Sequence, residues 1–140
     1  MKTLLRSSFI LIVVLLLISC GTSAKTKKED KALSPEERFQ LAFKAAERGN
    51  LEEAVNEYQQ VLKLAPKHSR AHLNLGSVLV RQGRIAEGVA EYECALRLKP
   101  DDADACMNLG VAFFHLGRVP EAIGCYERTL RITPDYAIAH

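Results

Sequence analysis

From residue 34 onward the sequence repeats with a period of 34 residues. The repeat is visible in four columns of similar residues: Pro66, Pro100 and Pro134; Tyr58, Tyr92 and Tyr126; Gly49, Gly83 and Gly117; and Leu41, Leu75 and Leu109. An internal period of this length indicates tandem supersecondary units that stack on one another, because one unit alone buries too little apolar surface to fold. We therefore expect a solenoid in which each unit packs against its neighbours.

Each unit has the pattern of two helices joined by a tight turn. In the first unit, apolar residues recur at helical spacing on both sides of Gly49, and Pro66 marks the end of the second helix. The string SPEE at residues 34–37 matches a capping box, so the first helix is expected to begin there. Four small residues are expected where paired helices approach closely: Gly76, Gly88, Gly110 and Ala122.

These units resemble the tetratricopeptide repeat. Its Leu-Gly pair, mid-unit Gly, Tyr and closing Pro stand in register in HLNLGSVLVRQGRIAEGVAEYECALRLKP and CMNLGVAFFHLGRVPEAIGCYERTLRITP. The resemblance implies an all-α helix-turn-helix solenoid of three complete repeats, at residues 34–68, 69–102 and 103–136, with a truncated fourth beginning at residues 137–140. The chain departs from the family at Arg38, His72 and Cys106, where a Trp is frequent, and at Ala42, which replaces a Gly.

Residues 1–19 have the pattern of a signal peptide. Lys2 and Arg6 precede ten apolar residues at 9–18. A run of this length is too short for a membrane span of roughly 20 residues, but suits the apolar region of a signal peptide, about 7 to 15 residues. The string LISC resembles the lipobox of bacterial lipoproteins, which implies that Cys20 is lipidated, by palmitate for example, and that the bond before it is cut. The alternatives are an uncleaved anchor and an ordinary secretory signal with a chance cysteine.

The lipobox resemblance implies a protein of the bacterial cell envelope, anchored to a membrane by its lipid. Gly21 stands where an Asp retains lipoproteins at the inner membrane of enterobacteria-like systems, which favours the outer membrane, facing the periplasm. Residues 20–33 are expected to form the lipidated cysteine and a flexible tether, because they are small, polar and charged without apolar periodicity. The lysines in this stretch either touch anionic headgroups or are simply solvated.

Charge and motifs argue against several functions. After Lys2 and Arg6 are removed with the signal peptide, 17 basic and 17 acidic residues remain, so there is no basic surface typical of nucleic-acid binding. The sequence has no nucleophile elbow, phosphate-binding loop, CxxC or zinc-protease motif. We expect no enzyme activity, no cofactor and no small-molecule substrate. The alternative is an interaction arm of a larger enzyme or sensor whose catalytic domain lies beyond residue 140.

Histidines and cysteines were considered as ligands and as disulfide partners. His68 and His72 are four residues apart, but His68 is expected in the loop between units and no carboxylate or cysteine is expected beside them, so we predict no metal site. With Cys20 lipidated, Cys94, Cys106 and Cys125 leave an odd number in an exported protein. Free thiols are expected; a Cys94–Cys106 bridge or an intermolecular bond is the alternative.

The family resemblance implies that the first helix of each repeat lines a concave surface that binds a partner. The positions carried over to this chain are Phe39, Phe43, Arg70, Leu73, Asn74, Val80, Arg81, Asp104, Met107, Asn108, Val111 and Phe114, together with Glu47, Ser77 and His115. Leu73, Val80, Met107, Val111 and Phe114 are expected to merge into one apolar strip that binds an amphipathic helix or an extended peptide. The alternative is that some of these residues pack between units.

Chaperone-binding members of the family grip a terminal carboxylate with lysine, arginine and asparagine. Phe39 and Phe43 occupy two of those columns in this chain, which argues against capture of a chaperone tail. The expected function is that of a non-catalytic scaffold or adaptor lipoprotein in assembly of the bacterial envelope, with a protein or peptide partner in the groove.

Overall fold

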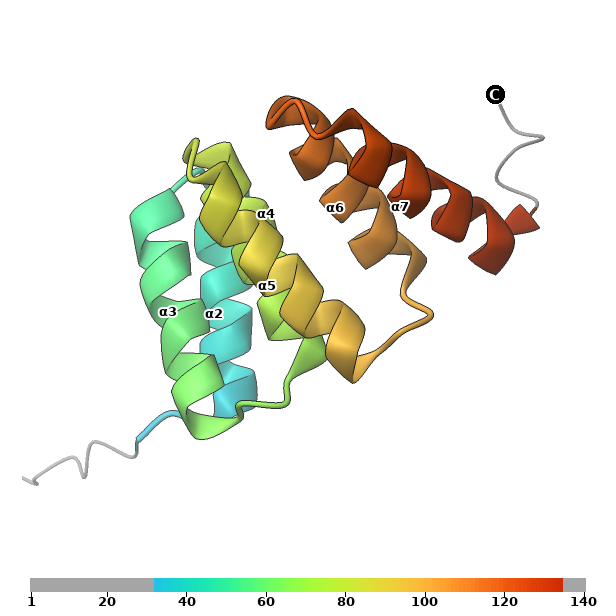
Figure 1. The fold of residues 1–140 in the computed structure, drawn as a ribbon. Coiled ribbons are helices and arrows are strands. Elements are labelled where there is room, and N and C mark those ends of the chain that lie inside the picture. Colours follow the sequence, from blue (N-terminus) through green and yellow to red (C-terminus); the bar gives the residue numbers. More distant parts are fainter. Residues whose placement is uncertain (1–31, 135–140) are drawn as a thin grey trace, which may run out of the picture. The chain divides into compact units, whose positions relative to one another are not determined.

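The structure is a computed structural model and describes residues 32–134. The described residues form six helices and no strand: α2 (Pro35–Glu47), α3 (Leu51–Leu64), α4 (Ser69–Arg81), α5 (Ile85–Leu98), α6 (Ala103–His115) and α7 (Val119–Ile132) (Figure 1). The predicted all-α fold is therefore confirmed. The predicted signal peptide, Cys20, most of the tether and the start of a fourth repeat at residues 137–140 lie outside the described residues.

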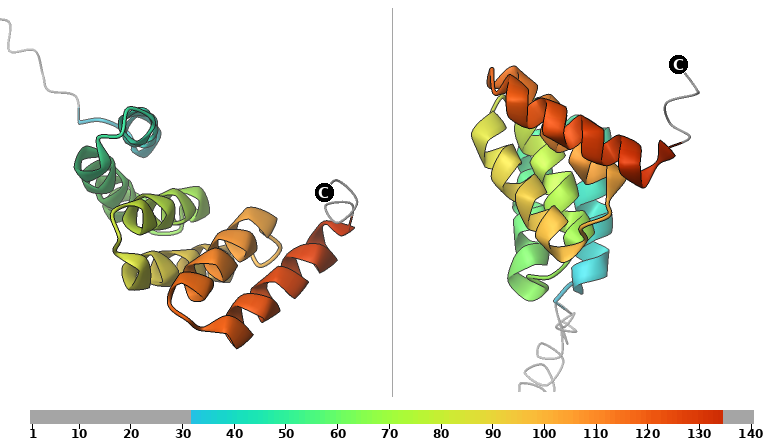
Figure 2. Two further views of the ribbon diagram at one scale, coloured as in Figure 1. Left: turned by 90° about the horizontal axis from the view of Figure 1, so that it is seen from above. Right: turned by 45° about the vertical axis from the view of Figure 1, so that its right-hand side comes forward.

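The six helices form three antiparallel hairpins stacked in chain order. The helices of each hairpin pack together, and successive hairpins meet where α3 contacts α4 and where α5 contacts α6. Figure 2 shows α2, α4 and α6 on one side of the stack and α3, α5 and α7 on the other. This arrangement is the predicted solenoid, and it gathers the first helices of all three units on one face.

Local sequence sets where helices begin and turn. At the start of α2, the Ser34 hydroxyl accepts from the Glu37 amide at 3.2 Å, and the Ser34 amide donates to the Glu37 carboxylate at 2.8 Å. This is the predicted capping box, and its hydrogen bonds lower the pKa of Glu37. The turns inside the hairpins use Gly49, Gly83 and Gly117, whose φ values of 82°, 80° and 73° lie in the left-handed region that favours glycine.

The paired helices approach closely at small residues, as predicted. A Cβ added to Gly76 on α4 would lie 2.7 Å from Cε1 of Tyr92 and 3.0 Å from the carbonyl oxygen of Gly88, both on α5. On α6, a Cβ at Gly110 would lie 2.6 Å from Cε1 of Tyr126. The tyrosine column therefore fills the space that the missing side chains leave open.

The first leucine of the repeated column is more exposed than the other two. Leu41 is 42% exposed, whereas Leu75 and Leu109 are 2% and 6% exposed. Leu75 and Leu109 are on α4 and α6, which each pack against the second helix of the preceding hairpin, whereas α2 is the first helix described. On α7, Ile123 and Leu130 are exposed.

None of the helices in residues 32–134 has the length and apolar character that a membrane span requires. Residues 33–134 belong to one compact unit.

Candidate peptide-binding groove

Two adjoining pockets lie on the face formed by the first helices. The first has a volume of about 300 Å³ and is lined by Phe39, Gln40, Phe43, Arg70, Leu73, Asn74 and Asp104. The second has a volume of about 190 Å³ and is lined by Phe43, Ala46, Glu47, Tyr58, Asn74, Ser77, Val78 and Arg81. Because Phe43 and Asn74 line both pockets, the two form one groove along α2 and α4 that reaches α6 at Asp104.

Aromatic rings hold the wall of the groove in place. Phe39 is only 7% exposed. Its ring stacks on His68 with the centroids 5.0 Å apart, and meets Tyr58 edge-on at 5.6 Å. Phe43, one turn further along α2, is 43% exposed. Phe39 is therefore part of the fixed wall, whereas Phe43 is a large apolar side chain exposed in the groove.

Hydrogen bonds between helices position the polar side chains of the groove. The Asn74 amide donates to the Tyr58 hydroxyl at 3.1 Å. The Tyr92 hydroxyl donates to Ser77 Oγ, and Ser77 Oγ donates to the Leu73 carbonyl, each at 3.1 Å. Burial raises the pKa of both tyrosines, so these hydroxyls stay protonated at neutral pH. The polar wall of the groove is thus preorganised.

Charged side chains of both signs stand at each pocket. Arg70 and Asp104, both exposed, line the first pocket. Arg81 and Glu47 line the second, where Arg81 Nη1 donates to the Ala46 carbonyl at 3.1 Å. One basic and one acidic side chain at each pocket favour a partner segment that carries both signs of charge in a fixed direction, rather than a segment with a single sign of charge.

The structure brings seven of the twelve carried-over positions to the groove: Phe39, Phe43, Arg70, Leu73, Asn74, Arg81 and Asp104. The remaining five line neither pocket. Met107 and Asn108 are half-buried on α6, and Val111 and Phe114 are exposed there. These two pockets are therefore centred on α2 and α4, and the apolar strip over α4 and α6 stays a prediction.

Val80 lies in the packing between helices and lines neither pocket. It is half-buried, packs against the core of the second and third hairpins, and has its Cγ2 only 2.6 Å from where a Cβ on Gly88 would stand. Val80 thus fills the contact between α4 and α5, which is the alternative that the sequence left open. Leu73 has two roles, since it lines the first pocket and also packs against the core of the second and third hairpins.

Sequence reasoning missed Tyr58 and Val78 as groove residues. Tyr58 is on a second helix, whereas all the positions predicted to line the groove are on first helices. Tyr58 reaches the groove because its hydroxyl accepts from the side-chain amide of Asn74, which lines both pockets.

The prediction that no carboxylate or cysteine lies beside His72 is wrong. His72 Nδ1 is 2.7 Å from Glu91 Oε2, and Cys94 completes a group of three potential ligands. His68 does not join them, because its Nδ1 accepts from the Ala71 amide at 3.1 Å and so caps α4. The pairing is invisible to a search of sequence neighbours, since Glu91 is 19 residues from His72 and on another helix.

Cys94, Cys106 and Cys125 are free thiols in the described part of the chain, as expected, and no Cys94–Cys106 bridge is seen there. Burial is the main cause that raises the pKa of the Cys106 and Cys125 thiols. Cys106 is 1% exposed, whereas Cys94 is half-buried.

We predict that Cys106 reacts last with an alkylating reagent. A raised pKa leaves less of the reactive thiolate, and burial keeps the reagent away. Iodoacetamide should therefore modify Cys94 of the native chain well before Cys106, as measured by peptide mass spectrometry, and the difference should vanish in denaturant. Equal rates in the native chain would contradict the burial of Cys106.

Comparison with known proteins agrees with this architecture. A family model described as "TPR repeat" matches residues 46–83, and one described as "Tetratricopeptide repeat" matches residues 76–137. No curated protein sequence matches the chain significantly.

Three solved structures illustrate the similarity. A crystal structure of MamA has a TM-score of 0.71 at 22% identity, covering 74% of this chain and 61% of that one. The first TPR of Spaghetti (RPAP3), bound to the HSP90 peptide SRMEEVD, has a TM-score of 0.71 at 24% identity, covering 73% and 81%. YrrB, a TPR protein with an unusual peptide-binding site, has a TM-score of 0.72 at 19% identity, covering 78% and 56%.

The chain spans 61% of the MamA chain and 56% of the YrrB chain, and at these identities the likeness concerns the fold. The family matches, the repeated columns and the stacked helix pairs agree with one another. Residues 46–137 of this chain are therefore tetratricopeptide repeats.

Proposed function

We propose that the chain is a non-catalytic scaffold that binds an extended peptide or an amphipathic helix in the groove of α2 and α4. The observation that carries this proposal is the pair of adjoining pockets that share Phe43 and Asn74. Two neighbouring pockets with a common apolar wall suit two apolar side chains of one partner segment, while the charged groups at each pocket set its direction.

Similar proteins support this proposal. The RPAP3 repeat domain is bound to a peptide, and YrrB has a peptide-binding site. The groove of this chain differs from a carboxylate clamp, because the exposed Asp104 carboxylate lines the first pocket and opposes a terminal carboxylate there. We therefore expect an internal apolar segment of the partner to be bound, rather than an acidic chain end.

We further propose that a lipid on Cys20 anchors these repeats to the bacterial outer membrane, facing the periplasm, where they assist assembly of the envelope. The support is the basic start, the apolar run at residues 9–18 and the LISC string. A tether over residues 20–33 separates the anchor from the first helix and leaves the groove free to meet a partner.

Phe43→Ser should weaken peptide binding about tenfold or more. Phe43 is shared by both pockets, so its loss removes apolar contact from two bound side chains, and hot spots of this kind are each worth about 2 kcal/mol or more. The fold should persist, because the side chain is exposed. Peptides selected from a random library on the full chain would be measured against both proteins by fluorescence polarisation.

Leu64→Ser is the matched control, since Leu64 is also an exposed apolar residue but is on α3 and lines neither pocket. It should leave the affinity unchanged. Circular dichroism establishes that both variants are folded. Peptides that bind Phe43→Ser as tightly as the parent, or that are lost with Leu64→Ser, would place the binding surface elsewhere.

A further inference from the structure

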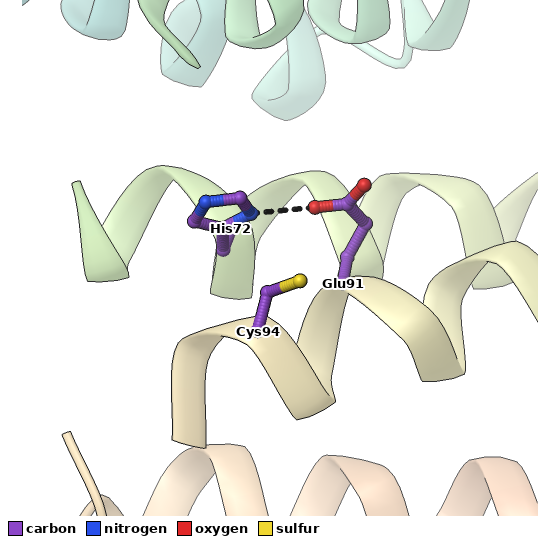
Figure 3. Close-up of side chains that lie close together, drawn as sticks. All are labelled: His72, Glu91 and Cys94. Carbon is purple, nitrogen blue, oxygen red and sulfur yellow. Dashed lines mark hydrogen bonds and ion pairs between the residues drawn. The ribbon is translucent and has the colours of Figure 1, made fainter. Parts of the chain in front are cut away.

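We propose that His72, Glu91 and Cys94 form a binding site for a divalent transition-metal ion of the zinc class between α4 and α5. His72 comes from α4, and Glu91 and Cys94 come from α5. Their potential ligand atoms all lie within 4.8 Å of one another. Figure 3 shows the three side chains directed toward a common point between the two helices. The site is separate from the groove, whose lining includes none of these residues.

Each ring nitrogen of His72 has a hydrogen-bond acceptor beside it. Nε2 is 3.0 Å from the Pro66 carbonyl oxygen, and Nδ1 is 2.7 Å from Glu91 Oε2. Both neighbours are acceptors, whereas a neutral imidazole has one N–H. With that N–H on Nε2, the lone pair of Nδ1 faces the carboxylate, and at 2.7 Å the two atoms share a proton. A bound metal ion would replace this proton once the two ligand atoms separate to about 3.3 Å, the spacing set by tetrahedral zinc.

The same hydrogen bond to Pro66 prepares the ring for a metal ion. Metal-binding histidines commonly donate their second ring N–H to a backbone carbonyl or carboxylate, which fixes the orientation of the ring. The Pro66 carbonyl is in position for this role at 3.0 Å from Nε2. Nδ1 is then the nitrogen available to the metal.

Cys94 is held at the site by a hydrogen bond from a cation. Arg97 Nη2 donates to Cys94 Sγ at 2.8 Å. Such a charge-assisted bond directs the sulfur and compensates the charge of a metal-bound thiolate. Glu91 and Cys94 are three residues apart on α5, so they share one face of the helix, toward His72.

Charge and burial favour a divalent ion at this point. A neutral imidazole, a carboxylate and a thiolate carry two negative charges, which one divalent ion neutralises. The His72 and Glu91 side chains are only 15% and 26% exposed, so water competes weakly for the ligands. Nitrogen, oxygen and sulfur together suit zinc, and three protein ligands leave one tetrahedral position for water.

The first repeat has an ion pair at the position that corresponds to His72 and Glu91. One period earlier, Arg38 stands in the column of His72 and Glu57 in that of Glu91, and Arg38 Nη1 is 2.9 Å from Glu57 Oε2. There the guanidinium supplies the cation that the carboxylate requires. In the second repeat, a histidine replaces the longer arginine and Cys94 lies beside it, so a bound metal ion would supply the positive charge next to Glu91.

The test is a titration of the full chain with Co²⁺, followed by competition with Zn²⁺. A cobalt ion bound to a thiolate absorbs in the near ultraviolet by charge transfer. We expect one Co²⁺ per chain with this absorption, and its loss as Zn²⁺ displaces the ion. Cys94→Ser should abolish the absorption, and His72→Gln and Glu91→Gln should each weaken Zn²⁺ binding about tenfold or more.

Matched controls use the same residue types elsewhere in the chain. Cys20→Ser, Cys125→Ser and Glu57→Gln should leave the absorption and the Zn²⁺ affinity unchanged, with circular dichroism to establish folding. Failure of the parent chain to show the absorption would overturn the proposal and leave His72 and Glu91 as a protonated ion pair. Absorption that survives Cys94→Ser, is lost with Cys125→Ser, or appears only when two chains associate would overturn it as well.

Discussion

Gly76→Ala is expected to destabilise the folded chain by about 1 to 3 kcal/mol, the usual cost of forcing extra atoms into a packed interface. The added Cβ would lie 2.7 Å from Cε1 of Tyr92 and 3.0 Å from the carbonyl oxygen of Gly88. The tyrosine is 3% exposed and its hydroxyl is bonded to Ser77, so the ring has little freedom to move away. The backbone of α5 must shift instead, and the contact between α4 and α5 is weakened.

The effect should grow with the size of the side chain, so Gly76→Val should cost more than Gly76→Ala. Ala42 occupies the same column in the first hairpin, completely buried, which shows that a hairpin built around a Cβ at this position is possible. The second hairpin instead has no Cβ at residue 76, and α5 also has a glycine facing it, at residue 88. The loss of unfolding free energy measured for Gly76→Ala therefore reports how closely α4 and α5 pack in this hairpin.

Gly124→Ala is the matched control and should have the opposite sign. Gly124 is inside α7, and within the described residues a Cβ there would have no heavy atom within 4 Å apart from its chain neighbours and the backbone of α7. Alanine should stabilise the helix by about 0.5 to 1 kcal/mol, because it reduces the entropy lost on folding. Both values are measured by urea unfolding followed by circular dichroism. A Gly76→Ala chain as stable as the parent would mean that the helices are not in the close contact described.

Cys20→Ser is expected to abolish lipid attachment completely. The thiol is the group that the lipobox resemblance implies is modified, and a serine hydroxyl does not replace it in that reaction. Each buried methylene contributes about 0.8 kcal/mol to membrane binding, so loss of several acyl chains should release the chain from the membrane fraction or leave an unprocessed precursor there. Metabolic labelling with a fatty acid in a bacterial host distinguishes the two chains.

Cys94→Ser is the control for this experiment, because it removes a cysteine of the repeats and keeps the lipobox. It should retain the full fatty-acid label. Equal labelling of Cys20→Ser and the parent would show that the fatty acid is attached elsewhere than Cys20. Absence of label from both would indicate that the segment at residues 9–18 acts as an ordinary signal or an uncleaved anchor.

Much of the fold was predictable from the columns of the sequence. The period of 34 residues implies repeated helix pairs, the glycines at 49, 83 and 117 mark turns that require positive φ, and the SPEE string marks the start of α2. These features are predictable because they depend on the conformational preferences of a few neighbouring residues. The family resemblance implied a binding face on the first helices, and the two pockets lie on that face.

The exposure of individual groove residues was not predictable in the same way. Phe43 and Val80 were equal candidates in the sequence, yet Phe43 is exposed and Val80 fills the contact with Gly88. Equivalent columns also differ, since Leu41 is exposed while Leu75 is buried. The physical reason is that a helical period specifies direction from the helix axis, whereas burial depends on which neighbouring helix packs there and how closely.

The cluster of His72, Glu91 and Cys94 also depends on contacts between helices that the sequence alone does not specify. The sequence contains all three residues, and periodicity assigns them to helices, but their meeting depends on the antiparallel register of α4 and α5. That register follows from close packing at Gly76 and Gly88 and from the bond between Tyr92 and Ser77. Local preference therefore determined the repeated elements, and the contacts between helices decided which side chains became a groove, a core or a cluster of ligands.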